Sequence, residues 1–128
     1  MSEQVVLDAS AILALLNDEP GAAMVADHLA GASISTVNVA ETLSKLSDHG
    51  MPAAEAFSVL QSLDITVVPF DARQALLAAK LRQKTRQAGL SLADRACLAL
   101  AQDLRLPVMT SDRAWKNVDA NVEIILIR

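Results

Sequence analysis

The stretch VVLDASAILALL, residues 5–16, places a single carboxylate between two apolar runs. The run before Asp8 is typical of a buried strand, and the run after Ser10 is typical of a helix. In one interpretation, Asp8 belongs to a polar turn, and Ser10 opens and caps the helix. In the other, Asp8 lies at the carboxyl end of a central strand and belongs to a functional site. The rest of the chain must distinguish the two.

The composition predicts one folded domain, residues 1–128, in a reducing compartment. The chain is 52% hydrophobic and 20% charged, which is enough to bury a core. Its one cysteine, Cys97, cannot form an internal disulfide and is expected to be a small buried residue. No apolar run approaches the roughly 18 residues of a membrane span. Because the MSEQ start also lacks the positive charge of a secretory signal, we expect a cytoplasmic protein.

Five apolar runs of strand length alternate with helical patterns. The runs are residues 5–7, 32–35, 65–68, 107–110 and 122–127. Helices are predicted over residues 10–17, 21–29 and 52–63, the last with Pro52 in its first turn. Further helices are predicted after a cap at Thr36, from a cap at Asp71 to about residue 87, from Ser91 to before Pro107, and for a short turn after Asp112. This alternation predicts an α/β fold, a parallel sheet flanked by helices on both faces. In such sheets the functional crevice lies beyond the carboxyl ends of the strands, where Asp8 and Asp112 fall.

Each of four acids has an ordinary structural explanation. Asp8 suits a polar turn, and Glu41 can pair with Lys45 one helical turn later. Asp94 stands three residues after Ser91 and can complete a variant capping box. Asp112 can cap a short helix that starts at RAWK.

Taken together, the four acids indicate a shared site. Two of them follow strands at one rim of the sheet, and the other two lie early in helices rich in small and apolar residues. Clustered carboxylates repel each other unless protons or cations compensate their charge. Acid clusters without His or Cys suit Mg²⁺, with Mn²⁺ possible, bound through oxygen.

Several polar neighbours of these acids are candidate supporting residues. Ser10, Thr110 and Ser111 can orient a carboxylate or a bound water, or they can be plain cap and turn residues. Asn38 lies one turn before Glu41 and can hydrogen-bond to the acids or only to backbone.

Four motifs, in order and at about the same spacing, resemble the PIN-domain ribonucleases, most closely the VapC-type toxins of bacterial toxin–antitoxin pairs. They are VVLDASAIL, STVNVAETLSKL, GLSLADRACLALA and PVMTSDRAW, and the resemblance covers essentially the whole chain. It places the family's four acids at Asp8, Glu41, Asp94 and Asp112, with the hydroxyl companion of the first at Ser10. It implies a five-stranded parallel sheet flanked by helices, and metal-dependent endonucleolytic cleavage of a structured RNA such as tRNA or rRNA.

The resemblance also implies protein partners and a role for the metal. A cognate VapB-like antitoxin would insert a peptide near the acids, and a second copy of the chain would form a homodimer. The apolar helices around 36–63 can supply a dimer face, or they can be ordinary core. Divalent cations would activate water and stabilise the leaving oxygen, so no histidine is required. That suits His28 and His49, which are predicted to lie far from the acid motifs, and Trp115, which is expected to pack under the site.

A basic run leads into the site and offers an RNA surface. The segment KLRQKTR contains Arg82 and Arg86, which together with Arg95, Arg113 and Lys116 could guide an RNA backbone to the acids. The alternative to an RNA surface is an ordinary solvated charged face, and Arg95 could equally pair with a nearby acid. The net charge of −4 argues against non-specific coating of nucleic acid, and three aromatic residues argue against base stacking as the main mode of recognition.

Two other functions would also account for an aspartate at the end of the first strand. A haloacid-dehalogenase-type phosphatase would use Asp8 as a covalent nucleophile, but its general acid is usually two residues on, and that position is Ser10. A catalytically silent PIN-like module that binds RNA or protein would keep the fold without the chemistry. The intact set of four acids argues against it.

Overall fold

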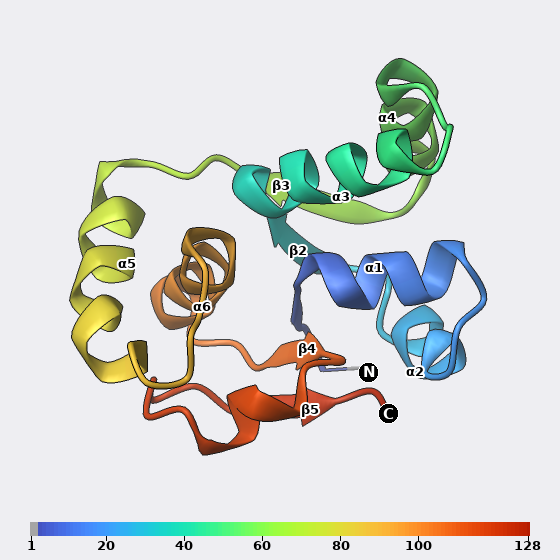
Figure 1. The fold of residues 1–128 in the computed structure, drawn as a ribbon. Coiled ribbons are helices and arrows are strands. Elements are labelled where there is room, and N and C mark those ends of the chain that lie inside the picture. The colour runs from blue at the N-terminus through green and yellow to red at the C-terminus, as the bar shows by residue number, and fades with distance from the viewer. Residues whose placement is uncertain (1–2) are drawn as a thin grey trace.

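A five-stranded parallel sheet, ordered β3-β2-β1-β4-β5, forms the centre of the computed structural model, which describes residues 3–128 (Figure 1). The strands are β1 Val6–Leu7, β2 Ala32–Ser35, β3 Ile65–Val68, β4 Val108–Thr110 and β5 Ile124–Leu126. The helices are α1 Ala9–Leu16, α2 Ala22–Asp27, α3 Thr36–Asp48, α4 Ala53–Ser62, α5 Ala72–Thr85, α6 Leu92–Leu104 and the 3-10 helix η1 Arg113–Asn117. The predicted α/β class, parallel sheet and flanking helices are confirmed.

Alternation along the central strand separates two hydrophobic cores. Val5 and Leu7 pack with Ile12 of α1 on one face, whereas Val6 packs with Leu98 of α6 on the other. In Figure 1, α1 and α2 lie on the first side, and α6 lies on the second with α5 outside it. Because both faces are covered, β1 is completely buried, and a carboxylate that follows it starts from the interior.

The helix starts correct two sequence-based predictions. Asp8, not Ser10, is the N-cap of α1, and Ser35, not Thr36, is the N-cap of α3. A capping residue needs extended backbone while its side chain reaches the first turn. Asp8 (φ −90°, ψ 177°) and Ser35 (φ −70°, ψ 144°) have that backbone, whereas Ser10 and Thr36 are already helical.

The caps predicted for the last two long helices are confirmed. Asp71 caps α5, and Ser91 caps α6. At the opposite end of α6, Arg105 adopts a left-handed conformation (φ 57°) and the chain turns into β4. Over residues 3–128, no helix combines the length and the apolar character needed to cross a membrane.

Candidate active site

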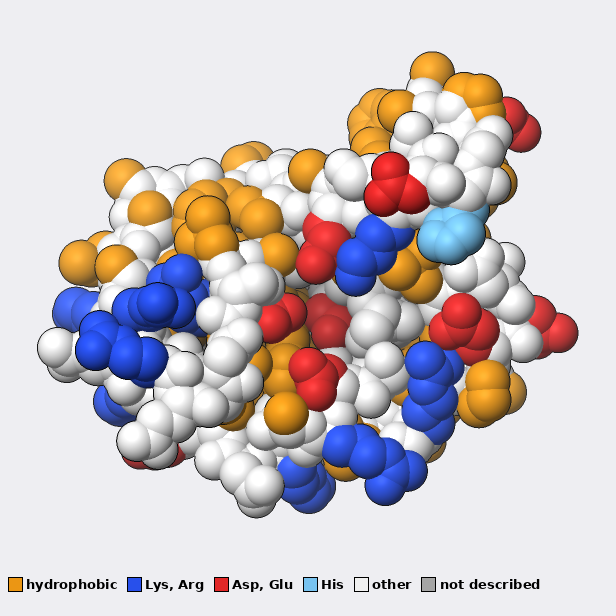
Figure 2. Space-filling model, viewed as in Figure 1, with side chains coloured by type: hydrophobic (Ala, Val, Ile, Leu, Met, Phe, Trp, Pro, Cys, Tyr) orange, Lys and Arg blue, Asp and Glu red, His pale blue; other side chains and the backbone are white. Residues whose placement is uncertain are grey.

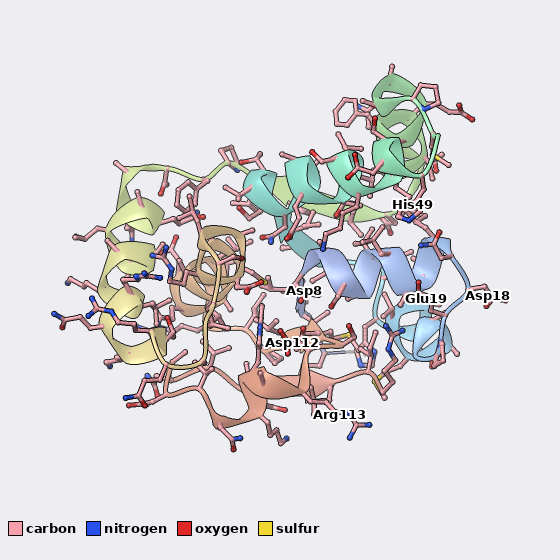
Figure 3. All side chains as sticks on the ribbon, in the orientation of Figure 1. Asp8, Asp18, Glu19, His49, Asp112 and Arg113 are labelled. Atoms are coloured by element: carbon pink, nitrogen blue, oxygen red, sulfur yellow. The ribbon has the colours of Figure 1, made fainter. Side chains whose placement is uncertain are left out.

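Asp8 occupies the junction between β1 and α1 and is 5% exposed. Its Oδ1 accepts hydrogen bonds from the Ser10 hydroxyl (2.7 Å) and the Ala11 amide (2.9 Å). Its Oδ2 accepts one from the Thr110 hydroxyl (2.6 Å). Both interpretations of the opening stretch are therefore partly right, because Asp8 caps the helix and is also a buried carboxylate at a strand end. Figure 3 shows Asp8 at the N-terminal end of α1, facing Asp112.

The buried position of Asp8 opposes its ionisation. Burial raises the pKa of the Asp8 carboxyl from 3.8 to about 6, and the nearby Asp94 charge adds to the shift. Hydrogen bonds from Thr110, Ser10 and Ala11 act in the opposite direction. No cationic side chain of the described residues forms an ion pair with Asp8, and its three donors hold it in one orientation.

Hydroxyl groups connect Asp8 to the segment after β4. The Ser10 hydroxyl accepts a hydrogen bond from the Ser111 amide (2.9 Å), and the Thr110 hydroxyl accepts one from the Asp112 amide (3.0 Å). Thr110 is completely buried. These two hydroxyls therefore fix the β4–η1 turn against the start of α1, so that Asp112 is held on the same rim as Asp8.

Glu41 reaches this rim from α3 and is tied to α6 through Asn38. The Asn38 side chain is fully buried, and its Nδ2 donates to the Ala93 carbonyl (3.0 Å) and to Glu41 Oε1 (3.5 Å). Both roles considered for Asn38 are thus present together. Glu41 Oε2 lies 3.8 Å from Lys45 Nζ, which is the helical pair expected from the spacing. Asn38 Oδ1 is buried without a hydrogen-bond partner among residues 3–128.

Asp94 and Asp112 make the capping contacts expected from the sequence. Asp94 Oδ2 accepts from the Ser91 amide (3.0 Å) and completes a capping box. Asp112 Oδ1 accepts from the Ala114 amide (3.0 Å). Each bond uses one carboxylate oxygen. Asp94 Oδ1 and Asp112 Oδ2 accept no hydrogen bond from the residues that the structure describes.

Cys97 lies within the electrostatic influence of three of the acids. It is fully buried, as expected, and burial raises the pKa of its thiol well above the ordinary range. The charges of Asp8, Asp94 and Glu41 add to this shift, so all three lie near the thiol. Trp115 packs in the same hydrophobic cluster as Cys97 and is completely buried, as predicted for a residue beneath the site.

The acids offer suitable donors for a hard divalent cation, but they do not form a compact ligand group. Over residues 3–128, no three His, Cys, Asp or Glu side chains are placed to hold a metal together. The oxygen-only donor set, the free oxygens of Asp94 and Asp112, and the uncompensated Asp8 fit Mg²⁺ chemistry. A cation would have to draw the carboxylates together, so the four-acid ligand set stays a prediction.

The predicted RNA-contacting residues divide into two groups. Arg82, Arg86, Arg113 and Lys116 are exposed. Arg95 is only partly exposed, and its Nη1 donates to the Ala78 carbonyl on α5 (3.0 Å). Arg95 therefore links α6 to α5 and forms no ion pair with an acid of the described residues. Its contact with RNA stays a prediction. Figure 2 shows acidic side chains in the middle of this face, with basic side chains to the left and to the lower right.

Sequence reasoning missed a group of residues beside the acids. Lys45, His49 and Arg128 line a cavity of about 540 Å³ together with Ser10. His49 is the C-cap of α3, eight residues after Glu41, and it lines the same cavity as Ser10, which contacts Asp8. The spacing Glu41, Lys45, His49 was an available signal, since residues four apart lie on one side of a helix.

Comparison with known proteins places this arrangement in a family. The PIN domain model matches residues 5–121. Ribonuclease VapC28 of Mycobacterium tuberculosis and a VapC ribonuclease of Mycobacterium bovis are each 32% identical to the chain over 125 residues, an alignment that covers 90% of this chain and 90% of each relative.

Solved structures share the fold at lower identity. A toxin–antitoxin complex from Klebsiella pneumoniae matches with a TM-score of 0.75 and 16% identity, covering 97% of this chain and 98% of that one. The Mycobacterium tuberculosis toxin VapC20, described as cleaving the sarcin-ricin loop, matches with a TM-score of 0.74 and 17% identity, covering 93% and 98%. The PIN domain match over residues 5–121 and the 32% identity to two VapC ribonucleases over 90% of the chain show that this chain belongs to the PIN-domain family of VapC ribonucleases.

Proposed function

We propose that the chain is a metal-dependent endoribonuclease that hydrolyses RNA phosphodiester bonds as the toxin of a toxin–antitoxin pair, acting in the cytoplasm. The observation that carries the proposal is the buried Asp8, held by two hydroxyls at the carboxyl end of β1. The Asp94 charge raises its pKa, and Thr110, which donates to Asp8, also accepts from the Asp112 amide. The 32% identity to VapC ribonucleases over 90% of the chain supports the same activity.

The four acids would hold Mg²⁺, or Mn²⁺ in its place. When bound, the cation supplies a stronger nucleophile from water and stabilises charge on the leaving oxygen. Ser10 and Thr110 orient Asp8, and Thr110 also fixes the backbone at Asp112. Asn38 holds α3 against α6 and so positions Glu41 relative to Asp94.

Exposed cations would bring the RNA backbone to these acids. Arg82 and Arg86 lie at the C-terminal end of α5, and Arg113 and Lys116 lie on η1 directly after Asp112. These positions flank the acids, which would otherwise repel a phosphate chain. The structured target, tRNA or rRNA, follows from the family resemblance.

Two protein partners belong to the proposal. A VapB-like antitoxin would block the acidic site, as suggested by relatives solved as VapBC complexes from Rickettsia felis and Salmonella typhimurium. A homodimer would use the apolar face of α3 and α4, where Phe57 is 41% exposed. Sedimentation velocity of the free chain measures the oligomer, and a monomer at micromolar concentration would exclude the dimer.

The test is cleavage of labelled total tRNA and rRNA by purified protein free of antitoxin, in Mg²⁺, in Mn²⁺ and in EDTA. An Asp94→Asn protein prepared in parallel controls for contaminating nuclease. Discrete cuts that need a divalent cation and disappear in the variant are expected. A folded protein that cuts neither pool in either metal would favour the silent binding module instead.

A further inference from the structure

A groove beside the acids has the lining of a nucleotide site. It lies between α1 and α3, and Arg128 also lines it. Its lining residues are Ser10, Leu13, Asn17, Glu19, Lys45, Leu46, His49 and Arg128. The volume of about 540 Å³ falls within the usual range of small-molecule sites.

The groove is continuous with the candidate active site at two points. Ser10 lines the groove and donates to Asp8 Oδ1 at 2.7 Å. Lys45 lines it from the other wall, and its Nζ lies 3.8 Å from Glu41 Oε2. A polynucleotide whose phosphate lies at the acids would therefore meet this groove with its next residue.

The charged groups of the groove suit a phosphate. Lys45 has a side chain 51% exposed, so its ammonium keeps donors for a ligand despite the neighbouring Glu41. Arg128 Nη1 donates to Glu19 Oε1 (3.2 Å) and to the Pro20 carbonyl (2.9 Å). These bonds fix the guanidinium by one edge and leave its other N–H groups for an anion.

His49 adds a third polar group in a defined orientation. Its Nδ1 lies 2.8 Å from the Lys45 carbonyl, which can only accept, so Nδ1 carries the hydrogen. Nε2 is then an acceptor in the neutral ring and a donor in the charged ring. Figure 3 shows His49 at the far end of α3, beside the C-terminal half of α1.

The remaining lining suits a base. Leu13 and Leu46 provide apolar surface, and Asn17 provides an amide with both donors and acceptors. The three aromatic residues of the chain, Phe57, Phe70 and Trp115, are not among the lining residues. A base would therefore pack on leucine rather than stack on an aromatic ring.

We propose that the groove lined by Leu13, Lys45, His49 and Arg128 holds the nucleotide next to the scissile phosphate, with its flanking phosphate at Lys45 and Arg128. The proposal rests on the proposed ribonuclease function and adds the side on which the RNA strand leaves the acids. A second cavity, of about 590 Å³, lies near Pro107 and Glu123 at the amino ends of the strands and includes Arg105. It is remote from the acids and provides a matched control.

The first experiment compares steady-state cleavage by Arg128→Gln, Lys45→Gln and Arg105→Gln proteins on an RNA that the wild type cuts. We expect KM to rise about tenfold for Arg128→Gln and Lys45→Gln, with kcat of Arg128→Gln within about twofold of wild type. Arg105→Gln loses the same charge and should match the wild type. Lys45→Arg should restore KM. Thermal unfolding of each protein identifies any loss that comes from misfolding at the Arg128–Glu19 contact.

The second experiment locates the nucleotide. Oligonucleotides centred on the cut are shortened one residue at a time from either end, and the Arg128→Gln effect is measured on each. The effect should disappear on one side of the cut when the residue that fills the groove is removed. A KM effect that is unchanged at every length would overturn the site.

The outcomes separate this proposal from the ribonuclease itself. If the wild type cuts RNA, and Arg128→Gln and Lys45→Gln behave like Arg105→Gln, the groove site is wrong and the ribonuclease stands. The groove would then be open to a protein partner. If the wild type neither binds nor cuts RNA, both proposals fail together.

Discussion

At the scale of single residues, Asp8 is destabilising in the metal-free protein, because its pKa of about 6 lies above the ordinary 3.8. Between these pH values the folded chain holds a proton that the unfolded chain has released. Stability therefore falls as pH rises through this window, by at most about 3 kcal/mol for two pKa units. Above pH 6 the full penalty of the buried charge is present.

The substitution Asp8→Asn should remove this penalty because it removes the buried charge. The asparagine can still cap α1. In EDTA, urea unfolding should show the variant to be more stable than wild type at pH 7 to 8, with the difference vanishing near pH 4. Cleavage should be abolished. A stability difference that is the same at all pH values would show that the pKa of Asp8 is the same in the folded and the unfolded chain, and so would contradict the account.

Thr110→Val tests the hydroxyl that links Asp8 and Asp112. The change keeps the shape of the side chain but removes the donor to Asp8 Oδ2 and the acceptor for the Asp112 amide. We expect a loss of about 1–3 kcal/mol in stability and of about 10- to 100-fold in activity. Thr110→Ser, which keeps the hydroxyl, is the control. Equal activity of the two variants would contradict a positioning role.

The sequence allowed the acids to be proposed but not the groove. Asp8, Glu41 and Asp94 could be grouped because motif order and strand ends place them at one rim, and the structure puts all three near Cys97. Arg128 gave no local signal, since its partner Glu19 lies 109 residues earlier. The hydrogen bond of Arg95 to the Ala78 carbonyl on α5 was not predictable either, because it depends on how the two helices pack.

At the scale of elements, the start of α6 combines capping with the site. Ser91 Oγ accepts from the Asp94 amide at 3.1 Å, while Asp94 Oδ2 accepts from the Ser91 amide. Ser91→Ala removes the first bond and leaves the second. It should lower stability by about 1 kcal/mol and leave cleavage within a few-fold of wild type. Asp94→Ala should lose both the cap and the activity.

Urea unfolding and cleavage rates of these two variants separate the roles. If Ser91→Ala abolished cleavage as completely as Asp94→Ala, the capping box itself would be the functional feature. Helix positions were predictable here because apolar periodicity and caps are local. The first residue of each helix was harder to predict. Ser10 and Thr36 are chemically as suitable for capping as the observed caps, Asp8 and Ser35, and only the backbone conformation distinguishes them.

At the scale of the whole molecule, acidic side chains lie in the middle of one face, and basic side chains lie to either side of them (Figure 2). The double substitution Arg82→Gln/Arg86→Gln should raise KM and reduce the salt dependence of RNA binding, because each phosphate contact contributes about 0.7 to the logarithmic slope for single strands. The value of kcat should change little. Arg73→Gln, at the other end of α5 and paired with Asp103 at 2.6 Å, is the control. A salt slope that is the same in the double variant and the control would exclude α5 from the RNA path.

The alternation of strands and helices along the sequence predicted the parallel sheet but not the order of its strands. The arrangement β3-β2-β1-β4-β5 puts β1 at the centre, with Val6 opposite Ser33 on one side and Val108 on the other. The pairing of β1 with β4 joins segments about a hundred residues apart, and it depends on the packing of both cores rather than on any local pattern. That pairing also brings Thr110 to Asp8.

The central claim is that the four acids bind a divalent cation at Asp8. The most direct measurement is Mn²⁺ binding, followed by electron paramagnetic resonance of free Mn²⁺, for wild type and for Asp8→Asn, Glu41→Gln, Asp94→Asn and Asp112→Asn proteins. Glu123→Gln is the control, because Glu123 directly precedes β5 and so lies at the amino ends of the strands, away from the acids. We predict saturable binding by the wild type and the control, weakened at least tenfold by Asp8→Asn and Asp94→Asn and less by the other two. Binding that is unchanged in Asp8→Asn and Asp94→Asn, with cleavage that persists in EDTA, would contradict the claim.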